Sequence, residues 1–184
     1  SKTFDNGTIC ASEQSVIMEA RMEPAVKAAL RSQGAYLLDE DETKQLSRFI
    51  LRSNGTMNPA IVGKSVETVA KLAGLSRVPA SARVLVARET GVGKGHPYSS
   101  EKLGLILACY VEPDEEAVLR RCVEILEWEG AGHTFAIHTE DEAVAKKFAA
   151  AVPASRVLVN TPASLGGIGA TTCLFPALTL GCGA

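Results

Sequence analysis

The order of hydrophobic and polar positions divides the chain into short apolar runs and longer stretches with apolar residues every three or four positions. The first pattern is typical of buried strands and the second of amphipathic helices. We predict strands over residues 14–18, 83–88, 103–111, 133–139 and 156–160, and a brief apolar stretch at 35–38. We predict helices from residue 24 to the glycine at 34 and over residues 39–51, 66–75, 113–129 and 139–150.

Helix-start signals support four of these helices. Pro24 and Pro113 suit the first turn of a helix, where the missing N–H leaves no hydrogen bond unmade. Ser65 is a suitable N-cap, and Thr139 and Glu142 have the spacing of a capping box. The last predicted strand is followed by a glycine-containing stretch, residues 161–172, which we predict to be a loop.

Strands that alternate with helices of this length predict an α/β fold. We expect a three-layer sandwich, with a mainly parallel sheet covered by helices on both faces. The chain has 184 residues, the size of one domain, and shows neither an internal repeat nor a convincing linker. We therefore predict a single domain over residues 1–184.

Composition excludes several function classes. The net charge is −2 and the basic residues are scattered, so nothing favours nucleic acid or an anionic membrane surface as partner. No apolar run approaches the roughly 20 residues that span a bilayer. The five cysteines have irregular spacing without a C-x-x-C pair, which favours reduced thiols and a cytoplasmic setting and gives no metal site.

One cysteine differs from the other four. Cys10 lies in a polar, glycine-containing turn, whereas Cys109 and Cys173 have apolar neighbours, Cys122 lies on a predicted helix and Cys182 lies in a glycine-rich stretch. A nucleophilic thiol must be reachable by its substrate, which the turn allows. Taken alone, however, a cysteine is more often a small residue at the edge of the core.

The residues around Cys10 change that balance. Residues 6–15 are Asn-Gly-Thr-Ile-Cys-Ala-Ser-Glu-Gln-Ser. This stretch resembles the nucleophile motif of the CoA-acylating branch of the aldehyde dehydrogenase superfamily, Asn-Gly-x-x-Cys-x-Ser-Glu-Gln-Ser. The resemblance implies that Cys10 carries the thiolate that attacks an aldehyde.

His133 is the second candidate catalytic residue. It follows a glycine-rich break and begins a predicted strand, so we expect it at an edge of the sheet, where ligands usually bind in open α/β folds. Without a family pattern, a polar residue between two elements would be the preferred interpretation. The triplet Gly-His-Thr at 132–134 matches one that holds a functional histidine in the acylating branch. His138 should point to the opposite face, and His96 has no supporting pattern.

Two further segments resemble the same family. Residues 97–102 resemble its Pro-Phe-x-x-Glu-x segment, with Tyr98 in place of phenylalanine, which implies that Glu101 binds the ribose next to nicotinamide. The alternative is a solvated charge before a strand. Residues 160–169 resemble the loop beside the aldehyde pocket, with Leu165 where a polar residue is frequent, and imply substrate-pocket roles for Ser164, Gly167 and Ile168. Residues 178–183 match the family as well.

The glycine-rich stretch at 91–95 does not support a phosphate site. A P-loop would need glycine in place of Arg88 and a Ser or Thr after Lys94. His96 likewise occupies the last glycine position of a dinucleotide-binding fingerprint. We interpret this stretch as a flexible lid or surface turn.

The resemblance implies an aldehyde dehydrogenase catalytic domain in which aldehyde, CoA and NAD or NADP give acyl-CoA and reduced nucleotide through a thioester on Cys10. His133 would assist proton transfer when CoA attacks. By the same resemblance, the cofactor-binding domain and the oligomerisation arm lie outside this chain. We therefore expect the chain by itself to be inactive and to self-associate through an exposed apolar interface, and the full-length parent to be a homo-oligomer.

Two other functions stay open from the residues. One is a hydrolytic aldehyde dehydrogenase, which releases a carboxylic acid, and the other is a non-catalytic α/β module with a structural cysteine. The aldehyde is not fixed by the sequence, although short aliphatic aldehydes are expected in this branch. NAD versus NADP, a separate or bifunctional parent, and free or microcompartment-enclosed enzyme in the cytoplasm also stay open.

Overall fold

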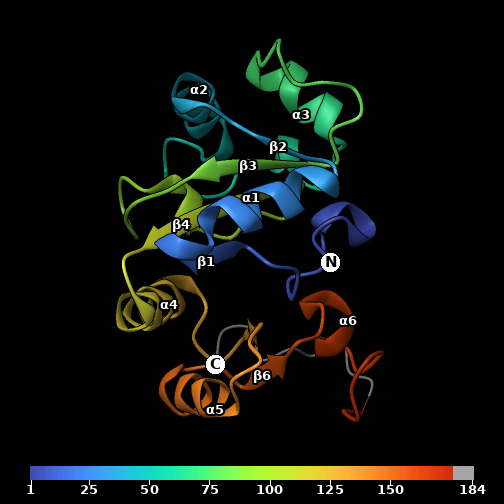
Figure 1. The fold of residues 1–184 in the computed structure, drawn as a ribbon. Helices are drawn as coiled ribbons and strands as arrows, with labels where there is room; N and C mark the ends of the chain where they lie inside the picture. Colours follow the sequence, from blue (N-terminus) through green and yellow to red (C-terminus); the bar gives the residue numbers. More distant parts are fainter. Residues whose placement is uncertain (176–184) are drawn as a thin grey trace.

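A parallel sheet of four strands forms the centre of the larger part of the molecule (Figure 1). The computed structural model describes residues 1–175, so Cys182 and the stretch at 178–183 lie outside the described residues. All three strand pairs in the sheet are parallel, as predicted. In spatial order the strands are β1 (Ser15–Glu19), β4 (Ile106–Glu112), β3 (Val84–Arg88) and β2 (Ala35–Leu37).

Helices cover both faces of this sheet, which confirms the predicted α/β sandwich. Leu85 and Ile106 point to the face covered by α2 (Glu40–Ile50) and α3 (Val66–Ala73). Val86 and Leu107, one residue further along each strand, point to the face covered by α1 (Glu23–Ser32). Strands buried on both sides are continuous apolar runs, which is why the sequence pattern identified them.

The remaining elements form a smaller unit around a second sheet, in which β5 (Thr134–Ile137) and β6 (Arg156–Val159) pair in parallel. Helices α4 (Glu115–Glu129) and α5 (Glu142–Ala151) share a core with it. Ile17 of β1 packs against this core and against the larger one. The strands of the described residues thus form two parallel sheets rather than the single sheet we predicted.

Helix ends show where local signals mislead. Asp114 caps α4 by accepting the Ala117 N–H, so Pro113 precedes the cap. Asp141 caps α5, while the Thr139 hydroxyl accepts the Asp141 N–H instead. The predicted capping box is therefore wrong, because a carboxylate two residues closer to the helix caps it in place of the Thr139 hydroxyl. The loop predicted at 161–172 contains a short helix, α6 (Ala163–Gly167).

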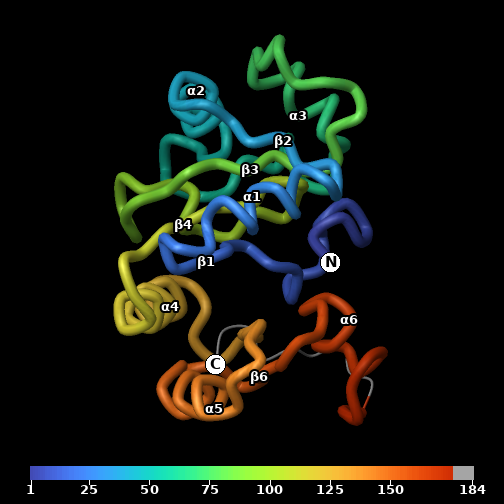
Figure 2. The backbone as a smooth tube through the Cα atoms, viewed as in Figure 1, coloured from blue at the N-terminus to red at the C-terminus, as the bar shows by residue number. Residues whose placement is uncertain are grey.

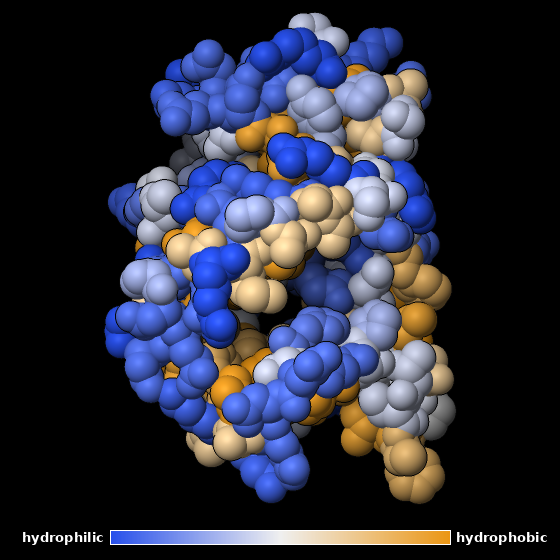
Figure 3. Space-filling model, in the orientation of Figure 1, coloured by the Kyte–Doolittle hydropathy of each residue, from blue (hydrophilic) through white to orange (hydrophobic). Residues whose placement is uncertain are grey.

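The N-terminal segment lies beside α6, although the two are far apart in sequence (Figure 2). The Ser1 hydroxyl accepts the Ser164 N–H at 2.9 Å and lies 2.6 Å from the Ser164 hydroxyl. The space-filling surface mixes hydrophilic and hydrophobic residues and is hollowed between the four-stranded sheet and the β5–β6 unit (Figure 3). Within residues 1–175, no helix combines the length and apolarity needed to cross a membrane.

Candidate active site

Cys10 occupies a turn between a 3₁₀ helix, η1 (Phe4–Gly7), and strand β1. The turn is closed by the Ser12 N–H, which donates to the Ile9 carbonyl at 2.9 Å. Cys10 is half-buried, whereas Cys109 and Cys122 are buried. Burial raises the pKa of both of those thiols, that of Cys122 to about 12. These two cysteines are therefore unsuited to act as thiolates near neutral pH.

The residues before Cys10 explain why the motif requires an Asn-Gly pair. Asp5, Asn6 and Gly7 all have positive φ, at 47°, 51° and 72°. A Cβ at Gly7 would lie 2.5 Å from the Gly104 carbonyl oxygen, so only glycine fits. The Asn6 side-chain amide donates to the Gly63 carbonyl at 3.1 Å. The turn is thus pressed onto the backbone of the larger unit.

The residues after Cys10 attach the turn to two other segments. The Gln14 side-chain oxygen accepts the Lys102 N–H at 2.9 Å, directly after Glu101. The Glu13 carboxylate accepts the Ala163 N–H at 3.0 Å, at the start of α6. The Ser-Glu-Gln portion of the motif therefore joins the nucleophile turn to the Glu101 segment and to α6.

His133 lies immediately before β5 and is half-buried. Its Nδ1 accepts the Thr134 backbone N–H at 2.8 Å, so in the neutral imidazole the proton belongs on Nε2. The pKa of His133 is lowered, first by burial and then by the nearby Arg156 guanidinium. The lowered pKa favours the neutral imidazole, in which Nε2 carries the proton.

Glu101 lies in the segment that leads into β4 and is exposed. Its backbone N–H donates to the carboxylate of Glu129, the last residue of α4, at 2.7 Å. The pKa of the Glu101 carboxyl is raised, first by partial desolvation and then by the Glu129 carboxylate. Glu129 is a residue of the site that sequence reasoning missed.

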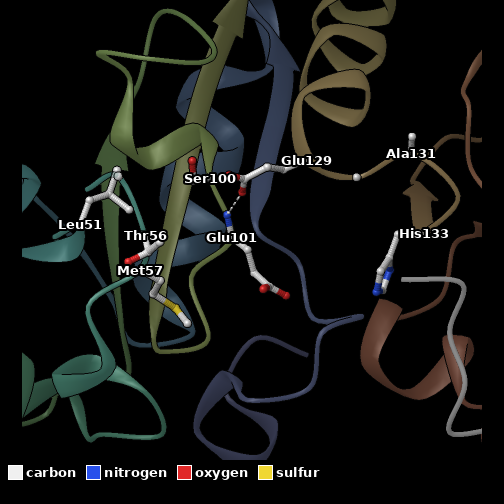
Figure 4. Close-up of a pocket in the computed structure, with 10 residues that line it drawn as sticks. Leu51, Thr56, Met57, Ser100, Glu101, Glu129, Ala131 and His133 are labelled. Carbon is white, nitrogen blue, oxygen red and sulfur yellow. Dashed lines mark hydrogen bonds between the residues drawn. The ribbon is translucent and has the colours of Figure 1, made fainter. Parts of the chain in front are cut away.

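Glu101 and His133 line one groove of about 470 Å³. Figure 4 shows the Glu101 carboxylate in the middle of the groove, with His133 on one side and Met57 on the other. This volume is within the usual range for small-molecule sites. The other lining residues are Leu51, Gly55, Thr56, Ser100, Glu129, Gly130 and Ala131.

Helix α6 connects the nucleophile turn to His133. A Cβ at Gly167 would lie 3.3 Å from the Ala11 Cβ and 3.7 Å from the Thr134 hydroxyl. The neighbours of Cys10 and His133 in the chain therefore meet at one point. The segment around residue 11 thus meets those around residues 134 and 167, although it lies more than a hundred residues from both in sequence.

The predicted substrate-pocket residues lie on or next to α6. Ser164 is fully buried and hydrogen-bonded to Ser1. Gly167 is buried, and Ile168 is half-buried directly after the helix. They hold α6 beside the nucleophile turn and do not line the groove between Glu101 and His133. Their contact with substrate stays a prediction.

The candidate site lies at the amino edge of the sheets. Cys10, Glu101 and His133 each precede a strand, so they lie beyond the amino ends of β1, β4 and β5. We expected His133 to begin a strand at a sheet edge, and it does lie directly before β5. Ligands of open α/β folds usually bind at the carboxyl edge, so that general rule does not describe this candidate site.

The other histidines lie elsewhere. His96 pairs through Nδ1 with the Glu89 carboxylate at 2.8 Å, and His138 is exposed beyond the end of β5. The glycine-rich stretch at 91–95 is held at both ends, since Gly91 accepts from the Tyr110 hydroxyl and Gly93 donates to the Ser99 hydroxyl. Within residues 1–175, no group of three or more acidic, histidine or cysteine side chains could hold a metal ion.

Comparison with curated proteins identifies relatives along the whole chain, while no protein-family model matches. The bifunctional aldehyde-alcohol dehydrogenase of Escherichia coli is 41% identical over 188 residues, which cover 100% of this chain and 21% of that protein. The acetylating succinate-semialdehyde dehydrogenase of Clostridium kluyveri is 37% identical over 99% of this chain and 40% of its own length. The chain thus spans between about a fifth and two fifths of these relatives.

Solved structures agree with the sequence relatives. A probable aldehyde dehydrogenase from Listeria monocytogenes superposes with a TM-score of 0.96 and is 60% identical, covering 100% of this chain and 40% of that one. An acetylating aldehyde dehydrogenase from Geobacillus thermoglucosidasius gives a TM-score of 0.95 at 45% identity with the same coverage. The chain therefore belongs to the acylating aldehyde dehydrogenases, of which it spans one part.

Proposed function

We propose that the protein carrying this chain converts an aldehyde, CoA and NAD(P)⁺ into acyl-CoA, NAD(P)H and a proton. The observation that carries this proposal is that the Glu101 and His133 segments line one groove and that the Cys10 turn is joined to both segments. Gly167 holds the residue after Cys10 against the residue after His133. The relatives named as acetylating or bifunctional aldehyde dehydrogenases support the same reaction.

The groove has the residues that a nicotinamide nucleotide requires. The exposed Glu101 carboxylate can accept hydrogen bonds from both hydroxyls of a ribose, and Met57 offers an apolar, polarisable surface to a flat ring. Bound nicotinamide supplies the hydride acceptor, and with it the oxidising equivalent that turns the adduct on Cys10 into a thioester. NAD and NADP both satisfy this arrangement.

Cys10 provides covalent catalysis. Its thiolate adds to the carbonyl carbon of the aldehyde, and after oxidation the acyl group remains on sulfur. The CoA thiolate then attacks the thioester carbon, the bond to the Cys10 sulfur breaks, and Cys10 leaves as thiolate. A thioester suits this exchange, because it remains reactive toward a second thiol.

His133 acts through Nε2. Because Nδ1 is occupied by the Thr134 N–H, the neutral ring is better suited to donate a hydrogen bond than to accept a proton. We assign it to the CoA half-reaction, where Nε2–H stabilises negative charge that develops as the thiolate attacks. This narrows the proton-transfer role expected from sequence to hydrogen-bond donation.

We propose short aliphatic aldehydes such as acetaldehyde as substrates, in line with the acetylating relatives. We further propose a homo-oligomer that acts in the cytoplasm. Cys109, Cys122 and Cys173 form no disulfide, which supports the cytoplasmic setting. A hydrolytic enzyme would instead produce a carboxylic acid without CoA. The identity to acylating enzymes along the whole chain favours the CoA-dependent reaction.

The test is a steady-state assay of the complete natural protein that carries this chain. With acetaldehyde and NAD⁺ or NADP⁺, absorbance from reduced nucleotide should increase only when CoA is added, with stoichiometric acetyl-CoA. Cys10→Ser should abolish the reaction, while Cys173→Ser, at an exposed cysteine, should leave it unchanged. Acetate formation that does not need CoA would overturn the proposal in favour of hydrolysis.

A further inference from the structure

Two lysines are buried between the nucleophile turn and the segment that carries Glu101. Lys2 is 6% exposed and Lys102 is 1% exposed. Lysine is almost never fully buried unless it is paired with an opposite charge. Neither lysine belongs to an ion pair within residues 1–175. Their burial therefore calls for an explanation beyond ordinary packing.

Lys102 binds the backbone of its own segment. Its ammonium donates to the carbonyl oxygens of Tyr98 at 2.6 Å and Ser100 at 2.7 Å. Both carbonyls belong to the residues that lead into Glu101. Lys102 thus fixes the backbone directly before the proposed ribose-binding carboxylate.

Lys2 binds both segments at once. Its ammonium donates to the Ser12 hydroxyl and the Gln14 side-chain oxygen, both at 3.3 Å, and to the Lys102 carbonyl at 3.0 Å. Gln14 also accepts the Lys102 N–H. One ammonium group and one amide oxygen therefore join the turn after Cys10 to the residue after Glu101.

The charge on this pair is poorly compensated. Burial is the first cause that lowers the pKa of Lys102 to about 7 and that of Lys2 to about 8, and the two ammonium groups repel each other at Lys102. The carboxylates of Glu13, Glu101 and Glu129 act in the opposite direction. Apolar side chains would fill the same space at lower electrostatic cost, so stability alone does not account for two lysines.

We propose that Lys2 and Lys102 are positioning residues that hold the Cys10 turn in register with Glu101. The inference rests on the proposed function, since it assigns Cys10 to the nucleophile and Glu101 to the nucleotide. In this arrangement the lysines touch neither reacting atoms nor nucleotide. They act through Ser12, Gln14 and the Lys102 carbonyl.

The first test is Lys2→Met in the complete natural protein, with Lys146→Met as matched control, because Lys146 is exposed and pairs only with Glu142 on its own helix. Lys2→Met should raise the KM for nucleotide and lower the rate of Cys10 alkylation by iodoacetamide, each by about tenfold, as a small misplacement does in other active sites. The control should change neither. Thermal unfolding identifies a variant that has lost its fold.

A second variant keeps the test decisive if Lys2→Met does not fold. Gln14→Glu retains the oxygen that accepts from Lys2 and Lys102, and it removes an amide N–H that is buried without a partner within residues 1–175. The new carboxylate should raise the pKa of both lysines, whose other charged neighbours are Glu13, Glu89, Glu101 and Glu129. The alkaline limb of kcat/KM for nucleotide should move up by about one pH unit.

If the lysines had a purely structural role, Gln14→Glu would leave the alkaline limb of the pH profile of kcat/KM unchanged. That result would overturn the inference even if the stability of the variant changed. Folded Lys2→Met protein with wild-type KM and alkylation rate would overturn it as well. If wild-type protein shows no CoA-dependent nucleotide reduction, the proposed function fails instead. The positioning role is then judged by the Cys10 alkylation rate alone, which needs no turnover.

Discussion

The two sides of the groove are held in different ways. The Glu101 side is fixed by contacts between segments distant in sequence, including the Gly7–Gly104 backbone contact and the Tyr98 hydroxyl, which donates to the Thr43 carbonyl at 2.7 Å. On the His133 side, the backbone carbonyl accepts the N–H groups of Ser155 and Arg156, while the imidazole accepts the N–H of the next residue in the chain. The difference indicates that changes on the Glu101 side disturb the fold, whereas changes on the His133 side act mainly on the chemistry.

The largest expected effect is from Gly7→Ala on the Glu101 side. The new Cβ would overlap the Gly104 carbonyl, and the positive φ adds backbone strain, so we expect a loss of about 3 kcal/mol or more in unfolding free energy. Gly55→Ala is the matched control, because Gly55 has a similar φ of +82° with nothing within 4 Å. It should lose about 1 kcal/mol. Equal denaturant midpoints for the two variants would contradict the close backbone contact.

The next effect concerns Glu101 itself. Glu101→Gln removes a charged acceptor, and a hydrogen bond to a charged group contributes about 1.5–3 kcal/mol, so the Kd for NADH should increase by about ten- to a hundredfold. Glu129→Gln keeps an oxygen for the Glu101 N–H and removes only a negative charge. It should lower the pKa of Glu101 with little change in NADH binding at pH 7. Fluorescence titration measures both, and equal losses would show that Glu129 binds the nucleotide directly.

A smaller effect is expected on the His133 side. Burial and Arg156 lower the pKa of His133, so Arg156→Gln should raise it toward 6.5, while burial keeps it below that value. NMR titration of the imidazole measures the shift. Because the unfolded state binds the proton first, His133 removes stability as pH falls through 6.5 toward its lowered pKa. If the titration midpoint of His133 were the same in Arg156→Gln as in the wild type, the Arg156 guanidinium would be excluded as a cause of the lowered pKa.

The smallest effect is expected from Gly167→Ala, where α6 meets both Ala11 and Thr134. The new Cβ would lie 3.3 Å from the Ala11 Cβ, a distance that a shift of a few tenths of an ångström relieves. We expect a loss below about 1 kcal/mol, since the residue has no positive φ to strain. A loss as large as that of Gly7→Ala would mean that the two sides of the groove are equally rigid.

Local sequence signals predicted most of the fold, because strands and helices here follow plain hydrophobic periodicity. Buried strands such as β3 and amphipathic helices such as α2 lie within a few residues of their predicted positions. The predicted helix start was wrong where two nearby residues could each cap the same helix, as with Thr139 and Asp141 before α5. Helix α6 was missed because its Ser-Leu-Gly-Gly composition is typical of loops.

The sequence singles out candidate site residues only where one residue type in a short motif carries the chemistry, as for Cys10, Glu101 and His133, and their roles stay predictions. Glu129, Lys2 and Lys102 carry no sequence signal. Glu129 and Lys2 act through contacts with segments at least 10 residues away, and Lys102 is buried beneath such a segment while it binds the backbone of its own. Only the folded chain shows that Lys102 is buried rather than solvated, or that Glu129 accepts the Glu101 N–H. The Glu101 side of the groove, which contacts between distant segments hold in place, is thus the side for which the sequence predicts the fewest contacts.

The central claim is that Cys10 carries the acyl group, and one measurement addresses it directly. The complete natural protein is incubated with acetaldehyde and NAD⁺ or NADP⁺ without CoA, quenched, and analysed by peptide mass spectrometry. The account predicts an acetyl group on the Cys10 peptide and none on those of Cys109 or Cys122, and its loss as acetyl-CoA when CoA is added before quenching. An unmodified Cys10, or an acetyl group that water removes as fast as CoA does, would contradict the account.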